Sequence, residues 1–410
     1  MAMCSTLTTW VWTAAFVVVV VVFAAASAIV LLKNVHDHDH VNENGKNKKK
    51  KRLVMPPGPR GLPIIGHLHL IGKNPHRDFQ KLSQIHGPIM RLRLGSADTI
   101  VASSPAAAEL FLRTHDLNFA TRPPMKVADY ITYGKKDVLF GQYGPLWREM
   151  RKLFIVELLS GHKVSSFESL RREELRLLVE SLKRTSEAGA VVDLSAKDLV
   201  VASVDTSTTL ILWTMSELIK NPTIMKKVKE ELGRQVGFGR VVEEKDLEHL
   251  KYLEMVIKES LRMHPVVPLL LPHAAVEDCT VGDFHVPKNA RLVVNVWAIT
   301  RDPNVWVNPD SFVPERFEGS SVDYRGRHFE LIPFGSGRRS CPGLQLGITT
   351  VRLVVAQLAH CFDWDLPNPK NADATRSHQD LDMTEEYGLT LNRAHHLMAV
   401  PSYKLLLRTC

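Results

Sequence analysis

The stretch PFGSGRRSCPG, residues 333–343, places a single cysteine, Cys341, behind two arginines and a glycine-rich turn, where Pro342 opens a predicted helix. A thiol that ligates a metal must be a thiolate. A position just before a helix N-terminus favours the thiolate through free backbone N–H groups and the helix dipole. Gly337 and Gly343 let the backbone approach a sulfur or a flat ring closely, and backbone N–H groups near the sulfur tune a bound metal.

The other residues of this stretch narrow the kind of metal site. We expect Arg339 to pair with an anionic group at the rim of a cofactor, and Phe334 to pack against the cofactor's face. One cysteine without a C-x-x-C partner does not suit structural zinc, whereas it suits a haem iron with a thiolate axial ligand. The alternative is a buried structural thiol. The pattern F-x-x-G-x-R-x-C-x-G disfavours it, because five fixed positions rarely coincide by chance.

The bulk composition is that of an ordinary globular chain of 410 residues, 45% hydrophobic and 23% charged, long enough to bury a large core. Part of the formal charge of +8 lies in the run KNKKKKR, residues 46–52, which is typical of a solvated face or a tether near anionic lipid. No aromatic-interleaved basic module accompanies it, so we expect no nucleic-acid partner. The five scattered cysteines argue against a disulfide scaffold and for a reducing compartment.

The N-terminal region predicts a membrane anchor. An uncharged segment rich in Val and Ala extends from Trp10 to Leu32, and roughly 20 apolar residues suffice to span a bilayer. A cleaved signal would have a basic leader, whereas here the basic cluster follows the span. The positive-inside tendency predicts a single-pass anchor over 1–32 with the rest of the chain in the cytoplasm. We expect a polar basic linker over 33–55 and a proline-rich hinge, or a plain linker, over 56–66.

Hydrophobic periodicity predicts a mainly α catalytic domain with a minor β-sheet over 67–410. Residues 89–104 alternate as two short strands around a Gly-Ser turn, and a helix is predicted from Pro105. Further short strands are predicted within 278–297. The remaining helical patterns cover residues 165–184, 199–220, 222–236, 250–264 and 343–362.

The string FGSGRRSCPG resembles the haem-binding loop of cytochromes P-450, and the chain resembles plant microsomal members of the A-type group from the anchor nearly to the C-terminus. The resemblance implies the P-450 fold and a haem b cofactor (iron protoporphyrin IX) whose iron takes Cys341 as its axial ligand. It also implies electrons from a membrane-bound NADPH–cytochrome P-450 reductase, and a location in the endoplasmic reticulum membrane. The loop residues that would contact the haem are Phe334, Gly337, Arg339, Cys341 and Gly343.

Glu259 and Arg262 in KESLRMHP match the family's E-x-x-R pair, whose side chains share one helix face at this spacing. In the family, the arginine of a downstream PERF string, here Arg316, joins them in a buried network behind the haem. Breaking such a buried charge set is costly, so we interpret the network as structural. Three pairs of the same spacing are interpreted as solvated surface pairs: Glu168/Arg171, Glu173/Arg176 and Glu231/Arg234.

Two further motifs imply contacts with the haem propionates. Trp147 and Arg151 in WREMR match the family's W-x-x-x-R pair, and the i, i+4 spacing puts both on one helix face. The alternative for this pair is a surface cation–π contact. His273 in LPHAAVEDC resembles a third propionate contact.

The string VVASVDTSTT, residues 200–209, resembles the family's oxygen-activating helix, usually A/G-G-x-D/E-T-T/S. Asp205 supplies the acid and Thr206 the hydroxyl of a pair that holds water and relays protons. The alternative is a Ser/Thr-rich helix whose hydroxyls bond to backbone carbonyls, which the haem loop disfavours. Ser203 stands where glycine is common, and we expect it to narrow the oxygen pocket.

The segment VVDLSAKDLVVASVDTS, residues 191–207, leads directly from one helix into the oxygen-activating helix. In the family several helices lie between, including two that form a lid over the substrate. Chain length predicts that about 90 residues are missing near 197–198. Without the cover, an apolar patch is exposed and water reaches the iron. Two explanations stay open: a splice or gene-model product, or a reduced protein that does not turn over.

These motifs predict a membrane-anchored haem-thiolate monooxygenase that inserts one oxygen atom of O2 into a small apolar, secondary-metabolite-like substrate. Basic side chains near the haem loop, among them Lys152 and Arg338, are expected to dock the acidic reductase. The alternatives are an inactive truncated haem-binding protein and a haem-thiolate isomerase or dehydratase, a class that commonly lacks the acid–threonine pair. The substrate-facing candidates are residues 122–134, 266–270 and 388–390.

Overall fold

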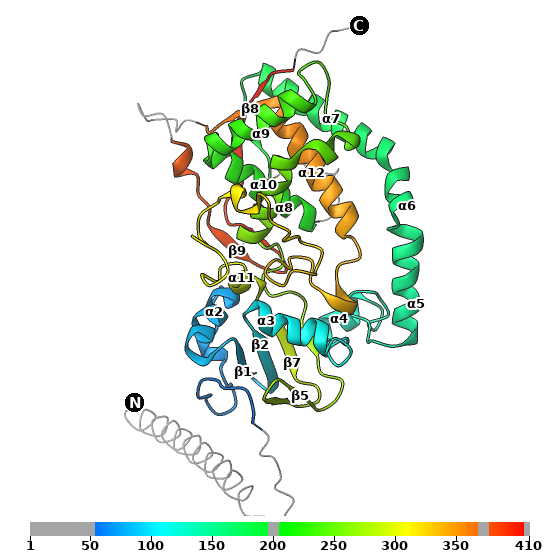
Figure 1. Ribbon diagram of the computed structural model, residues 1–410, viewed down its shortest axis with the longest axis vertical. Coiled ribbons are helices and arrows are strands. Elements are labelled where there is room, and N and C mark those ends of the chain that lie inside the picture. The colour runs from blue at the N-terminus through cyan, green and yellow to red at the C-terminus, as the bar shows by residue number, and fades with distance from the viewer. Residues whose placement is uncertain (1–53, 196–204, 368–376, 406–410) are drawn as a thin grey trace, which may run out of the picture. The chain divides into compact units, whose positions relative to one another are not determined.

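The computed structural model describes residues 54–195, 205–367 and 377–405. The chain divides into two compact units, Met1–Leu53 with Leu62–Ile64, and Val54–Gly61 with Ile65–Cys410. The helices and strands of the described residues lie in the second unit and are mainly helices with small sheets (Figure 1). The predicted mainly α fold with a minor sheet is therefore confirmed. The predicted anchor over 1–32 and nearly all of the predicted linker lie outside the described residues.

The largest sheet has four strands in the order β1-β2-β7-β4. The strands are β1 (Ile89–Leu94), β2 (Ala97–Ala102), β7 (Arg291–Val294) and β4 (His273–Ala274). β1 and β2 form the predicted antiparallel hairpin, and Gly95 takes the positive φ of +63° that this turn requires. β7 then pairs in parallel with β2, which joins residues nearly 200 positions apart in the sequence.

Two helices flank the strands of this hairpin in the sequence, α2 (Pro75–His86) and α3 (Pro105–Glu109). α3 begins as the sequence predicts, with Pro105 in its first turn and the Ser104 hydroxyl accepting a hydrogen bond from the Ala107 N–H. A hydrophobic cluster between the sheet and α3 includes Ile100, Phe111 and Leu292. β4, which carries His273, is thereby held on a packed sheet.

The remaining strands form three small sheets. They are β3 (Val192–Asp193), β5 (Cys279–Val281), β6 (Phe284–Val286), β8 (Phe362–Asp365), β9 (Glu385–Tyr387), β10 (Leu391–Arg393) and β11 (Met398–Tyr403). β3 and β8 both pair with β11, β5 pairs with β6 as the sequence predicts, and β9 pairs with β10 as a hairpin.

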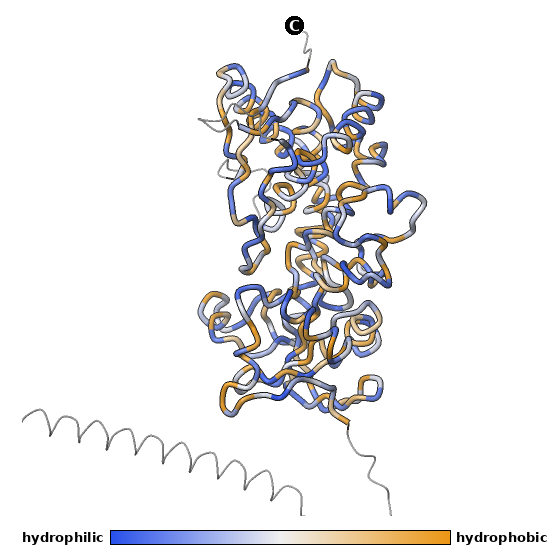
Figure 2. Tube along the Cα trace, turned by 90° about the vertical axis from the view of Figure 1, so that its left-hand side faces the viewer, coloured by the Kyte–Doolittle hydropathy of each residue, from blue (hydrophilic) through white to orange (hydrophobic). Residues whose placement is uncertain are grey.

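The larger hydrophobic cluster is helical and contains buried residues of α7, α8, α9, α10 and α12. The longer helices are α5 (Pro145–Leu153), α7 (Glu168–Glu187), α8 (Asp205–Lys220), α9 (Pro222–Gln235), α10 (Lys251–Met263) and α12 (Leu344–Cys361). The shorter ones are α4 (Lys126–Ile131), α6 (Gly161–Ser166) and α11 (Val296–Ile299). Hydrophobic and hydrophilic residues alternate along most of the helical trace (Figure 2), as expected for helices buried on one face.

Within the described residues the predicted helices are present, with one difference. The helix predicted over 165–184 is split, because α6 ends at Ser166 and α7 starts at Glu168. Short helical turns complete the chain: η1 (Leu68–Leu70), η2 (Leu110–Thr114), η3 (Phe154–Leu158), η5 (Glu244–His249), η6 (Pro314–Phe317), η7 (Gly337–Arg339) and η8 (His378–Asp380). The predicted helix over 199–220 is described from Asp205 onward.

α12 is the central helix of the larger cluster and contacts α7, α8, α9 and α10. Within the described part of the chain it is the one helix long and apolar enough to cross a membrane, but 67% of its apolar window is buried inside the protein. Its hydrophobicity is therefore explained by its position in the core.

The first part of the proline-rich segment over 56–66 packs against the large sheet. The Arg91 N–H of β1 donates a hydrogen bond to the Pro57 carbonyl over 2.8 Å. A Cβ atom on Gly58 would lie 2.1 Å from the Arg91 carbonyl oxygen, so only glycine fits beside this strand. The residues around Pro57 are thus fixed to the edge of the sheet.

Candidate active site

The loop that carries Cys341 is fixed by backbone contacts. Gly337 has φ +68°, and a Cβ atom there would lie 2.2 Å from the Leu112 carbonyl oxygen, so a side chain at this position is excluded. The Cys341 N–H donates to the Phe334 carbonyl over 2.9 Å. The cysteine side chain is accessible, and the following helix, α12, begins at Leu344, two residues later than Pro342 suggested.

The electrostatic surroundings of Cys341 only partly match the prediction. Although the residue reaches solvent, the protein packed around Sγ desolvates it in part and raises the pKa of the thiol, while the Gly343 N–H and the charge of Arg151 act in the opposite direction. The predicted lowering by a backbone N–H near the helix start is present, but desolvation outweighs it and the net shift of this pKa is upward. A metal ion bound directly to Sγ would supply the missing positive charge, since coordination deprotonates a thiol.

Two arginine side chains lie against the indole ring of Trp147 on α5. Its buried indole N–H donates to the Val138 carbonyl over 2.8 Å. The guanidinium of Arg151 lies 5.4 Å from the ring centroid and that of Arg339 4.0 Å from it. Arg151 also donates to the Ser340 carbonyl over 2.7 Å, directly beside Cys341. The structure thus joins the W-x-x-x-R pair of α5 to the haem-loop arginine.

His273 lies buried close to this group. Its Nδ1 lies 2.7 Å from the Phe119 carbonyl oxygen, so Nδ1 carries the proton and donates it. Burial, followed by the charges of Arg122 and Arg339, lowers the pKa of His273 to about 3. The imidazole is therefore neutral at physiological pH and adds a hydrogen-bonding group without adding charge.

Arg122 completes the group, and the motifs of the sequence did not indicate it. Its Nη1 donates to the carbonyls of Leu271 and Pro272, over 2.7 and 2.9 Å. Burial lowers the pKa of Arg122 to about 9, and the charges of Arg339 and Arg151 contribute. The signal in the sequence is an arginine before two prolines, inside a segment that we assigned to the substrate. Only the fold brings this arginine beside β4.

The three guanidiniums of Arg122, Arg151 and Arg339 form a cluster that we call the arginine cluster. Burial and the charge of Arg151 also lower the pKa of Arg339 to about 10, and the acid that opposes this shift is Asp137. Asp137 thus offsets the charge of Arg339, whereas Arg122 and Arg339 each feel the repulsion of a neighbouring guanidinium. An anionic group with two carboxylates, such as the propionates of haem, relieves this repulsion. The residues present therefore fit a haem group, with Cys341 as thiolate ligand.

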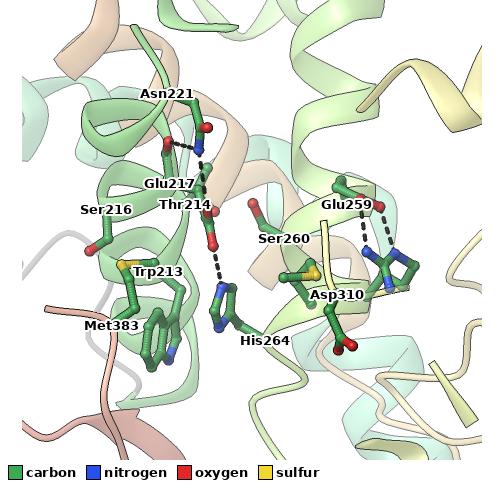
Figure 3. A network of polar contacts seen from close by, with 12 residues as sticks. Trp213, Thr214, Ser216, Glu217, Asn221, Glu259, Ser260, His264, Asp310 and Met383 are labelled. Carbon is green, nitrogen blue, oxygen red and sulfur yellow. Dashed lines mark hydrogen bonds and ion pairs between the residues drawn. The ribbon is translucent and has the colours of Figure 1, made fainter. Parts of the chain in front are cut away.

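The contacts predicted among Glu259, Arg262 and Arg316 are present, with Glu259 and Arg262 fully buried and the Arg316 side chain 10% exposed. Arg262 donates from Nε and Nη2 to Glu259 over 2.7 and 2.8 Å, and Figure 3 shows Glu259 on α10 with both bonds. Arg316 of η6 donates from Nε to Glu259 over 3.0 Å. Arg262 Nη1 also donates to the Thr300 and Pro309 carbonyls. These contacts tie α10 to the segment around residues 300–316.

Two of the three pairs interpreted as solvated surface pairs are buried contacts. Arg171 is only 7% exposed and pairs with Glu244 of η5 over 2.6 and 2.9 Å, not with Glu168. Glu231 is buried and accepts the N–H groups of the first turn of α10. Both interpretations are wrong, because the fold supplies partners that are distant in sequence. The Glu173–Arg176 pair is exposed, as predicted.

Asp205 and Thr206 occupy the first turn of α8, and both are exposed. Asp205 Oδ2 accepts a hydrogen bond from the Thr390 hydroxyl over 2.9 Å. The next residue, Ser207, faces α12, since a Cβ atom on Gly347 would lie 3.7 Å from its Oγ. The start of α8 therefore lies against the first turns of the helix that follows Cys341. Ala202 and Ser203 lie outside the described residues.

The family model described as Cytochrome P450 matches this chain over residues 56–197 and 192–387. The chain therefore belongs to the cytochrome P450 family of haem-thiolate monooxygenases, which are oxidoreductases.

Among its relatives, Cytochrome P450 CYP736A12 of Panax ginseng is 42% identical over 474 positions, covering 86% of this chain and 94% of the relative. Flavonoid 3'-monooxygenase CYP75B137 of Crocosmia x crocosmiiflora is 34% identical and covers 86% and 93%. Cytochrome P450 71D2 of Catharanthus roseus is 32% identical and covers 86% and 92%. The chain is thus similar to plant members of the family, as the sequence predicted.

The comparisons also locate the internal gap. The two matched segments meet at residues 192–197, which is the junction indicated by the sequence. The alignment with the ginseng relative has 474 positions, whereas 86% of 410 residues is about 353, so about 120 positions lack a counterpart here. The two matched segments agree with an internal gap near the predicted junction, and the alignment leaves room for the predicted loss of about 90 residues.

Proposed function

We propose that this chain is a membrane-anchored monooxygenase that binds haem b and oxidises a small apolar substrate. The observation that carries the proposal is that the arginine cluster lies beside the Cys341 loop. Cys341 offers a sulfur ligand, and the arginines offer an anion site at the same place. A thiolate-ligated haem iron activates O2 for insertion of one oxygen atom. The chain's own residues bind and orient this group and supply protons.

Each residue has a defined task in this proposal. Cys341 would ligate the iron through Sγ, and the arginine cluster would hold the propionates. The buried network of Glu259, Arg262 and Arg316 would support the protein behind the loop. Thr206 Oγ1 and the carboxylate of Asp205 would hold water and pass protons toward bound oxygen.

The proposed substrate class rests on the relatives and on apolar candidates. Two relatives are named as flavonoid hydroxylases and one as Salviol synthase of Salvia pomifera, which supports a secondary-metabolite-like substrate. Val266 and Leu269 of the candidate segment 266–270 are buried, and Leu389 of the segment 388–390 is 73% exposed. We propose that these segments, with α4, line the substrate side of the haem.

The primary test is the carbon monoxide difference spectrum of the reduced, membrane-expressed chain, with Cys341→Ser as the matched control. A strongly red-shifted band in the parent and its loss in the variant support thiolate ligation by Cys341. A band at the position of a lost or protonated thiolate in the parent, or no haem at all, contradicts the proposal. Fractionation of the same membranes tests the proposed location in the endoplasmic reticulum.

We further propose that the electrons come from an NADPH–cytochrome P-450 reductase that docks on the basic face around Arg151. Lys152 is exposed on this face, whereas Arg338 already pairs with Asp116 over 3.2 Å. Lys152→Glu is therefore the cleaner charge reversal and should weaken binding of the reductase, most strongly at low salt. Unchanged affinity at low salt would reject this docking face.

The second candidate function is an inactive haem-binding protein. It is favoured by the gap of about 120 positions and by the exposure of Asp205 and Thr206. Oxygen-dependent NADPH consumption with product separates the two candidates. In an active monooxygenase, Thr206→Ala should divert electrons from product to peroxide. Product formation that is unaffected by Thr206→Ala points instead to an isomerase or dehydratase, which needs no proton relay to oxygen.

A further inference from the structure

One face of α8 is attached to the β9–β10 hairpin by a row of hydrogen bonds. Asp205, Thr209 and Trp213 are spaced i, i+4, i+8 and therefore lie on one helix face. Trp213 Nε1 donates to the Leu391 carbonyl over 2.8 Å, and both Asp205 and Thr209 contact hairpin side chains. The hairpin thus runs beside the start of the helix that carries the acid–alcohol pair.

The side chains between them form a directed chain. The Thr209 hydroxyl donates to Asn392 Oδ1 over 2.5 Å, and Asn392 Nδ2 donates to Thr390 Oγ1 over 3.1 Å. The Thr390 hydroxyl then donates to Asp205 Oδ2 over 2.9 Å. The donors of these three hydrogen bonds all point toward Asp205, whose Oδ2 is the final acceptor. Thr209 and Thr390 are 3% and 4% exposed, so water competes little for these bonds.

The other strand of the hairpin is held equally firmly. Glu385 on β9 pairs with Arg77 of α2 over 2.5 Å, and its side chain is 6% exposed. Tyr387 stacks on the buried His76 at 5.5 Å between ring centroids. These contacts fix the hairpin to α2, so the position of Thr390 is set from two directions. An exposed Asp205 on its own would rotate freely, whereas a fixed donor restricts it to one orientation.

We propose that Thr390 and Asn392 are positioning residues that hold the Asp205 carboxylate on α8 in the orientation required for proton delivery. Thr390 acts directly on Oδ2, and Asn392 orients the Thr390 hydroxyl. The role in proton delivery rests on the proposed monooxygenase function, whereas the contact between Thr390 and Asp205 does not. The contact can therefore be tested without turnover.

The experiment compares Thr390→Val, which removes the hydroxyl at nearly constant shape, with Thr390→Ser, which retains it. Thr384→Val is the matched control, because Thr384 is exposed just before β9 and takes no part in the row of hydrogen bonds from Thr209 to Asp205. The first readout is the infrared band of the Asp205 carboxylate, identified by its loss in Asp205→Asn. The second readout is product formed per NADPH consumed, together with the peroxide released.

We expect Thr390→Val to shift the Asp205 band and to lower product per NADPH severalfold, with peroxide rising in compensation. Thr390→Ser and Thr384→Val should leave both readouts at the parent values. An unshifted band in Thr390→Val overturns the proposal, and so does a shifted band with unchanged coupling in an active chain. If the parent forms no product, the proposed function fails, while the band still decides whether Thr390 positions Asp205.

Discussion

The glutamate–arginine network and the first turn of α8 differ in how completely the protein surrounds them. Glu259 and Arg262 are 0% exposed, and their charged groups have protein partners. Asp205 and Thr206 are exposed, and the described chain resumes only at Asp205. The first region contains what is needed to hold a cofactor. The second is open to solvent, so we expect cofactor binding and turnover to depend on different parts of this chain.

A second contrast follows the same division. α12 is buried along most of its length, whereas η3, with four apolar residues out of five, has no buried residue. Ile155 and Val156 are 43% and 51% exposed. The two segments matched by the family model meet at residues 192–197, and β3 fixes the chain just before this point to β11. The core helix is thus buried, whereas η3 is an exposed apolar turn.

The largest effect is expected from breaking the buried network. Glu259→Ala leaves Arg262 and Arg316 buried without their anion, which should lower the free energy of unfolding by about 3–5 kcal/mol. Haem content should fall with it, because the network supports the loop region. Denaturant unfolding and haem content per chain are the measurements. Glu173→Ala, in an exposed pair of the same spacing, is the control and should change neither. A similar loss of stability and haem in both variants would contradict the claim that the buried pair is structural and the exposed pair is not.

The next effect concerns Glu385, which attaches the hairpin beside Asp205 to α2. Burial acts to raise the pKa of Glu385, but the nearby His76 imidazole, the hydrogen bond from Arg77 and the charge of Arg301 outweigh it and lower the pKa to about 2. A lowered pKa stabilises the fold above the unfolded value of 4.5, and this contribution is lost as the pH falls from there toward 2. The shift corresponds to on the order of 3 kcal/mol.

Unfolding free energies of the parent and of Glu385→Gln between pH 7 and pH 2 test this assignment. The variant should be less stable at pH 7 and should lose less stability on acidification. Glu386→Gln changes the exposed neighbour and serves as control. Parallel pH profiles of parent and Glu385→Gln would show that Glu385 does not hold the hairpin.

Arg122→Gln is expected to have a smaller effect on haem retention, and it also removes the hydrogen bonds to the Leu271 and Pro272 carbonyls. A hydrogen bond to a charged group contributes roughly 1.5–3 kcal/mol, so Arg122→Gln should speed haem loss by about ten- to a hundredfold. Transfer of haem to an excess of apomyoglobin measures this rate. Arg113→Gln, in an exposed pair with Glu109, is the control. Equal rates of haem loss in the two variants would show that Arg122 does not bind the propionates.

The sequence could predict the haem loop and the glutamate–arginine network because their residues are fixed by spacing in short strings. It also located the helices, since each has an apolar face of helical period. It could not predict Arg122 or the partner of Arg171, because both depend on contacts between distant segments. The strands near the C-terminus were missed for the same reason: β11 is specified by its pairing with β3 and β8.

The smallest effect sharpens the contrast between η3 and α12. If η3 has an open surface, Ile155→Ser with Val156→Ser should change the free energy of unfolding by no more than about 0.5 kcal/mol. The same change should reduce binding of a hydrophobic dye, because it removes accessible apolar surface. Leu358→Ala on α12, where Leu358 is 1% exposed, should cost about 2–5 kcal/mol. A cost above about 1 kcal/mol for the η3 double variant exceeds the range for an open surface. It would mean that another part of the chain, or a partner, covers this turn in solution.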